Sequence, residues 1–187
     1  MKDNVTFAGI FTKEMKESLT NRIEANRREY HRLLKDSNYT DVRFNPRNGA
    51  LLAIHKEHYF DPTIGIFGIP RGNYEKIAAE VLYDYGKSII LWSENKGIGI
   101  KMPEGLLDGK KFDIKGIEGT GKRNIVDKIS DAGSQGAETV VLYYHDEEIF
   151  DLQKIINAYN GYLKLSKTKR IQTVYYIVDN KLHKIGL

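Results

Sequence analysis

A regular succession of helix-length and strand-length segments between Asn73 and Ile185 is the feature that most constrains the fold of this chain. The apolar spacing predicts helices over Asn73 to about Tyr85, Gly121 to about Ala132 and about Glu147 to Tyr162. Strands are expected over the segments Lys87 to Trp92, Lys111 to Ile117, Glu138 to Tyr144, Ile171 to Val178 and Lys181 to Ile185. Because helices interspersed with short strands bury their apolar faces on a shared sheet, the sequence predicts an α/β fold with a mixed β-sheet flanked by helices.

The residues before Asn73 predict a helical arm and an irregular connection. From Thr12 to about Leu34, apolar side chains recur at three- and four-residue steps without Pro or Gly, which is the pattern of an amphipathic helix. Between Asp41 and Gly72, turn-forming residues are dense, so a hairpin-like or irregular lead-in is expected. We therefore divide the chain into an N-terminal helical arm, residues 1–40, and one α/β domain, residues 41–187.

Composition limits the chemistry and the location of the protein. The chain has no cysteine, so a metal ion would be held by Asp, Glu, His or water. The formal net charge of +4 and the isoelectric point near 9.0 are compatible with a phosphate-rich partner. The longest apolar runs have the length of strands, and the N-terminus lacks the pattern of a signal peptide. We expect no membrane contact and a cytoplasmic location.

The segment from Gly116 to Lys122 matches the first seven positions of the phosphate-binding loop G-x-x-x-x-G-K-[ST]. The eighth position is Arg123, which cannot coordinate a cation as the Ser or Thr hydroxyl of such a loop does. The preceding strand is also not continuously apolar, unlike the central parallel strand of nucleotide-binding folds. We expect no nucleoside triphosphate site here, but expect Lys122 and Arg123 to contact the phosphates of a nucleic acid near the start of the following helix.

A D-x-K tripeptide on that strand offers a different chemistry. The two-residue period of a strand puts Asp113 and Lys115 on one face. An upstream carboxylate, Glu104 or Asp108, would lie on a neighbouring strand, because Asp108-Gly109 is typical of a chain reversal. Two such carboxylates can hold one divalent cation, and a lysine beside them can orient water or stabilise charge on a phosphate. The pattern suits phosphodiester hydrolysis, and the simpler alternative is an exposed strand face with an Asp–Lys pair.

Three motifs surround this tripeptide in a recognisable order. A helix E-x-x-A-A-x-x-L-x-x-x-G runs from Glu75 to Gly86, a D-G-K-x-x-D-x-K element runs from Asp108 to Lys115, and a Q-(G/A)-A element at Gln135 leads into an apolar strand. In these motifs, over about Asn73 to Ile185, the chain resembles the PD-(D/E)xK nuclease superfamily. It resembles in particular the C-terminal toxin nuclease domains of contact-dependent inhibition systems and similar nuclease modules of phages and mobile elements. The resemblance implies a restriction-endonuclease-like fold and an enzyme that hydrolyses nucleic acid.

The same resemblance implies roles for individual residues. Glu75, Glu104 and Asp113 would hold a divalent metal ion, Mg, Mn or Zn, and Lys115 would act with them in catalysis. Gln135 matches the glutamine that closes the second helix and would contact the nucleic acid. Glu104 stands where the family usually has Asp, and because Asp108 is an equally acidic neighbour, the assignment of this metal ligand between the two stays open.

The biological setting follows from the resemblance alone. It implies a toxin-like nuclease that prefers RNA, in particular tRNA, over duplex DNA. It also implies a cognate immunity protein as a partner, and delivery into the cytoplasm of a target cell as part of a larger protein.

Two alternatives to a metal-dependent nuclease remain open. The H-K-E-H segment supplies His55 and His58, whose imidazoles could act as acid and base in a metal-independent ribonuclease of the barnase/EndoU/colicin/RelE-like kind. The lead-in around this segment resembles segments that precede nuclease modules of phage and mobile-element proteins. The other alternative is a non-catalytic nucleic-acid-binding protein of a mobile element. For either function, the strongest local positive run contains Lys167, Lys169 and Arg170, and we expect it to contact nucleic acid.

Overall fold

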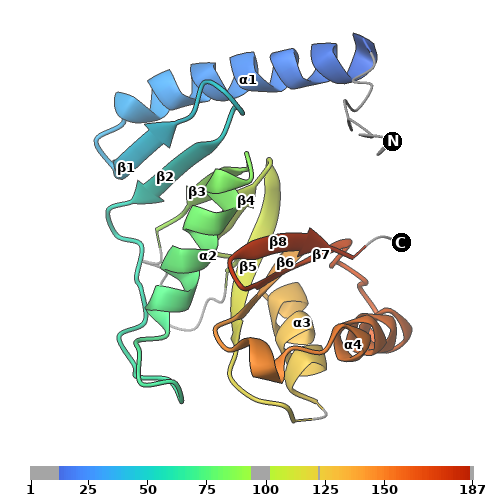
Figure 1. Ribbon diagram of the computed structural model, residues 1–187. Helices are drawn as coiled ribbons and strands as arrows, with labels where there is room; N and C mark the ends of the chain where they lie inside the picture. The colour runs from blue at the N-terminus through green and yellow to red at the C-terminus, as the bar shows by residue number, and fades with distance from the viewer. Residues whose placement is uncertain (1–12, 94–101, 122, 186–187) are drawn as a thin grey trace, which may run out of the picture.

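The computed structural model describes residues 13–93, 102–121 and 123–185 (Figure 1). Within these ranges, eight strands form one sheet, and their order across the sheet equals their order along the chain. The strands are β1 (Tyr39–Phe44), β2 (Leu51–His55), β3 (Ser88–Leu91), β4 (Gly105–Leu107), β5 (Lys110–Ile117), β6 (Thr139–Tyr144), β7 (Thr173–Val178) and β8 (Lys181–Lys184). The helices are α1 (Lys13–Leu34), α2 (Gly72–Asp84), α3 (Asn124–Ser134) and α4 (Leu152–Leu165), with a 3₁₀ turn, η1 (Glu147–Ile149), before α4.

The sheet is mixed, which confirms the fold class predicted from the sequence. β2 and β3 run parallel, as do β5, β6 and β7, while the remaining neighbours are antiparallel. Alternate residues of β6 divide between two cores, since Val141 and Tyr143 pack with α2, whereas Val140 and Leu142 pack with α3 and α4. Helices therefore cover both faces of the sheet (Figure 1). Within the described residues, no helix combines the length and the apolar composition that crossing a bilayer requires.

The helix α1 lies across β1 and β2 (Figure 1). Leu33 is fully buried in a cluster with Leu51, Ala53 and Ile90, whereas Leu34 is 52% exposed. The C-terminal part of α1 thus shares a core with the sheet. The boundary expected after residue 40 falls inside β1, because the chain enters the sheet at Tyr39.

The lead-in between residues 41 and 72 is more regular than expected. β1 and β2 form the hairpin-like unit, and β2 also pairs in parallel with β3, which makes it an interior strand. Leu51, Leu52 and Ala53 are consecutively buried, as expected for a strand covered on both faces. This segment therefore belongs to the sheet and holds the loop after it, residues 56–71, beside the start of α2.

The strands β4 and β5 separate part of the way along β5. β4 has three residues, and its pairing with β5 ends where Gly105 meets Phe112. β5 continues to Ile117 paired with β6. Glu104 and Asp113 follow directly after the last pair, so both carboxylates lie where the two strands diverge. We call this place the β4–β5 opening.

Candidate metal centre

The β4–β5 opening brings together two acidic side chains that the sequence singled out. Asp113 is fully buried, and its carboxyl group interacts with the side chain of Glu104. Asp108 lies at the other end of β4, where its carboxylate accepts hydrogen bonds from Lys87 Nζ at 2.8 Å and from the Ser88 amide at 3.0 Å. Asp108 is therefore not part of the group, and the geometry favours Glu104 as the second carboxylate. The antiparallel register is the cause, since it pairs the start of β4 with the middle of β5.

Lys115 lies on the same face as Asp113, as the two-residue strand period predicts. Its Nζ is 2.8 Å from Asp113 Oδ2 and 3.0 Å from Asp131 Oδ2 on α3. Gln135 Nε2 in turn donates a hydrogen bond to Asp131 Oδ2 at 3.0 Å. The expected glutamine thus reaches the site indirectly, through an aspartate that sequence reasoning missed. The sequence could have indicated Asp131 by its spacing from Gln135, since residues 131 and 135 lie one turn apart on a helix face.

Glu75 and His58 complete the group. Glu75 projects from the first turn of α2, and His58 belongs to the loop after β2. His58 Nε2 lies 3.7 Å from Glu75 Oε2 and 3.9 Å from Glu104 Oε2. Within the described residues, ligand atoms of these three side chains lie within 4.8 Å of one another, close enough for one metal ion to bind all three. Among the described residues, the group of metal-binding size is thus His58, Glu75 and Glu104, and Asp113 adjoins it through its contacts with Glu104 and with the Lys115 amine.

The orientation of His58 suits a metal ligand. Its Nδ1 lies 2.8 Å from the Trp92 carbonyl oxygen, which can only accept a hydrogen bond. In the neutral ring Nδ1 therefore carries the proton, and Nε2 presents its lone pair toward Glu75 and Glu104. A backbone carbonyl that fixes the tautomer in this way is a common support for histidine ligands.

The electrostatics of the group favour a bound cation. Burial raises the pKa of Asp113 above its usual value, and Lys115 partly opposes that shift. Burial lowers the pKa of Lys115, but the nearby carboxylates of Asp113 and Asp131 outweigh it, so the pKa is raised and the amine stays protonated. Asp113 and Asp131 both contact the Lys115 ammonium group, and Glu75 and Glu104 add two carboxylates that line the same pocket as Lys115. A divalent cation with oxygen ligands would offset the remaining negative charge.

A pocket of about 320 Å³ opens onto the group. It is lined by Asp61, Arg71, Tyr74, Glu75, Glu104, Ile114, Lys115, Gly116, Glu118 and Lys128. From the group described above, Glu75, Glu104 and Lys115 line it, and Asp113 does not. This volume lies within the range of ligand sites in proteins.

The remaining predicted residues lie outside this group. His55, on β2, accepts a hydrogen bond at Nδ1 from the Glu57 amide at 3.1 Å and packs its ring against Tyr39. Arg123 is exposed at the start of α3, and Lys122 lies outside the described residues. Lys167, Lys169 and Arg170 are exposed between α4 and β7. The Arg170 guanidinium lies beside Gly136, the residue after Gln135.

Comparisons of the chain with protein-family models, curated proteins and solved structures gave no match.

Proposed function

We propose that this protein is a divalent-metal-dependent nuclease that hydrolyses phosphodiester bonds in RNA. The observation that carries the proposal is the His58–Glu75–Glu104 group, which could hold a metal ion, with Asp113 and the Lys115 amine beside Glu104 at the β4–β5 opening. Glu75 comes from α2, Glu104 from the residue before β4, and Asp113 and Lys115 from β5, which is the chain order of the motifs in the sequence. The preference for RNA, including tRNA, and an immunity protein as partner are parts of the proposal that rest on the family resemblance.

Each side chain has a role in this reaction. Glu75, Glu104, Asp113 and His58 would hold the cation, which lowers the pKa of bound water and neutralises charge on the phosphate. Lys115 is protonated beside Asp113 and Asp131, so it stabilises negative charge on the scissile phosphate instead of accepting a proton. Asp131 positions the Lys115 amine, and Gln135 positions Asp131. A nitrogen ligand among carboxylates favours Mn or Zn over Mg.

The metal-independent ribonuclease has weaker support. The side chain of His58 is fully enclosed, which keeps it from the 2′-hydroxyl of a substrate, and His55 points to Tyr39 on the edge of the sheet. The two histidines therefore do not form an acid–base pair around one pocket. A non-catalytic binding protein has no need of a buried Asp–Lys pair beside a group of carboxylates, which gives the nuclease the better fit.

The test is cleavage by the purified protein of tRNA, mRNA, single-stranded DNA and duplex DNA, with Mg, Mn, Zn or EDTA. We expect RNA cleavage that EDTA abolishes and that Asp113→Asn reduces at least about a hundredfold, since both remove charge stabilisation of the transition state. His55→Ala is the matched control and should retain activity. Cleavage that survives EDTA and Asp113→Asn would show that the metal mechanism is wrong.

A further inference from the structure

The pocket beside the carboxylate group is also lined by charged side chains that the proposed reaction does not use, the cations Arg71 and Lys128 and the carboxylates Asp61 and Glu118. Arg71 stands immediately before α2, and Lys128 lies on α3, one turn before Asp131. Both line the same pocket as Glu75, Glu104 and Lys115. One continuous pocket therefore joins the acidic group to two further cations, contributed by elements on either side of β5.

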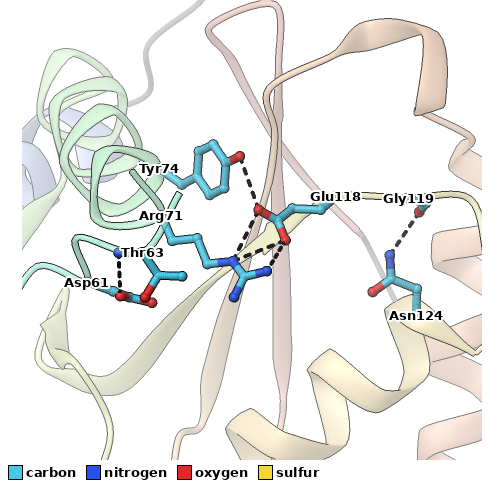
Figure 2. Close-up of polar contacts among 7 residues, drawn as sticks. All are labelled: Asp61, Thr63, Arg71, Tyr74, Glu118, Gly119 and Asn124. Carbon is cyan, nitrogen blue, oxygen red and sulfur yellow. Dashed lines mark hydrogen bonds and ion pairs between the residues drawn. The ribbon is translucent and has the colours of Figure 1, made fainter. Parts of the chain in front are cut away.

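Arg71 is held by a carboxylate, Glu118, at the end of β5. The guanidinium donates from Nη2 to Glu118 Oε2 at 2.8 Å and from Nε to both carboxylate oxygens at 3.2 Å. The Tyr74 hydroxyl donates to Glu118 Oε1 at 3.2 Å, so the carboxylate is gripped from two sides (Figure 2). Arg71, together with Tyr74 and Lys128, lowers the pKa of Glu118, which keeps the carboxylate charged.

The forked geometry at Arg71 is that of an oxyanion site. A guanidinium binds a phosphate through the same pair of parallel hydrogen bonds with which it binds a carboxylate. Arg71 is also accessible, since its side chain is 47% exposed, whereas that of Glu118 is 18% exposed. A phosphate arriving from solvent can therefore reach the guanidinium and compete with Glu118 for it.

We propose that Arg71 and Lys128 form a second phosphate subsite, which binds the phosphate next to the scissile one in a nucleic-acid strand. Until nucleic acid binds, the Glu118 carboxylate is paired with the Arg71 guanidinium. The phosphate then either displaces Glu118 from the guanidinium or binds the guanidinium together with it. This inference rests on the proposed nuclease function. The substrate class it selects is a strand carrying at least two successive phosphates, because a lone phosphate can engage only one part of the pocket.

If the subsite exists, removing the charge of Arg71 and removing the charge of Glu118 should change the affinity for nucleic acid in opposite directions. Arg71→Ala removes a phosphate contact, so we expect weaker binding by about threefold to tenfold, a higher KM with little change in kcat, and a salt dependence shallower by about 0.7 in slope on single strands. Glu118→Gln removes the competitor, so we expect binding tighter by about twofold to fivefold. If the Arg71–Glu118 pair only stabilised the fold, both variants would shift binding in the same direction or leave it unchanged.

The experiment measures fluorescence anisotropy of a labelled single-stranded oligoribonucleotide at several salt concentrations in EDTA, and cleavage kinetics in Mn. Arg47→Ala is the control, because it removes the same charge from an exposed position in the turn between β1 and β2. Thermal unfolding of each variant checks the fold. The subsite is supported when Arg71→Ala and Glu118→Gln change affinity in opposite directions while Arg47→Ala matches the wild type.

The failures of the two proposals are distinguishable. A wild type that cleaves RNA while Arg71→Ala and Glu118→Gln both behave as Arg47→Ala would overturn the subsite and leave the nuclease standing. A wild type that binds no oligonucleotide and cleaves none with any metal would overturn both. Weaker binding by Glu118→Gln would also defeat the subsite, because a competitor cannot help the ligand it competes with.

Discussion

The side chains of the site differ in how well the sequence alone predicts their positions. The period of a strand was enough to place Asp113 and Lys115 together, and their 2.8 Å contact bears this out. The choice between Glu104 and Asp108 needed the register of β4 against β5, which local sequence does not encode. The position of His58 beside the carboxylates depends on its contact with the Trp92 carbonyl oxygen, which lies 34 residues further along the chain. Long-range pairing of this kind leaves no periodic signal.

Removing the imidazole of His58 should weaken metal binding. In His58→Ala the remaining ligands are all oxygens, so we expect Mn affinity to fall by at least about tenfold. Mg affinity should fall less, because Mg prefers oxygen ligands. Isothermal titration calorimetry with each metal measures both values, and His55→Ala serves as the control. Equal Mn affinity in His58→Ala and the wild type would exclude the imidazole from the metal site.

At the scale of elements, the helices and the longer strands after residue 73 were predicted with the correct type, whereas their ends, and β1 and β2 as strands of the sheet, were not. α4 begins at Leu152 instead of about Glu147, because Asp151 caps it by accepting a hydrogen bond from the Lys154 amide at 3.1 Å. The preceding residues 147–149 form η1, which Asp146 caps in the same way. Asp146 and Asp151 are both able to cap the start of a helix, so the sequence alone does not show at which of them α4 begins.

The loop of residues 61–71 is an element whose position depends on one glycine. A Cβ at Gly65 would collide with Glu118 Oε1 and would lie 2.7 Å from the Tyr74 hydroxyl. Gly65→Ala should therefore displace the Glu118 carboxylate and loosen the loop, with a loss in the free energy of unfolding of about 1 kcal/mol. Hydrogen exchange of amides 61–71 should accelerate.

Gly121→Ala is the matched control for this loop, since a Cβ there meets no atom within 4 Å. Its exchange rates over residues 61–71 should equal those of the wild type. Unchanged exchange in Gly65→Ala as well would mean that the loop is held independently of Glu118.

At the scale of the whole molecule, buried phenols govern the response to alkaline pH. Burial, followed by the nearby charge of Glu118, raises the pKa of Tyr74 to about 12, and burial also raises the pKa values of Tyr143, Tyr144 and Tyr159. The unfolded chain loses these protons first, near pH 10. Stability is therefore fully present below about pH 10 and falls as the pH rises through the pKa values of the folded protein.

Chemical denaturation at pH values on either side of 10 checks this expectation, with tyrosinate absorbance as a second measurement. Tyr74→Phe should show a shallower loss of stability with rising pH than the wild type. Tyr59→Phe, which removes a phenol that is 57% exposed, should match the wild type. A stability that stays level through this pH range would contradict the assignment of these phenols as buried in the folded state.

The agreement between spatial and chain order of the eight strands bears on how the protein is made. Each strand finds its partner among residues already synthesised, so the sheet can extend vectorially as the chain leaves the ribosome, with short connections at three of the seven steps and longer ones at the other four. The growing edge is then always the newest strand. At β7 this edge is apolar, with Val174 and Ile177 fully buried in the finished protein, and such an edge pairs readily with other copies. β8 ends the series with exposed Lys181, His183 and Lys184, a charged edge that discourages further strand addition.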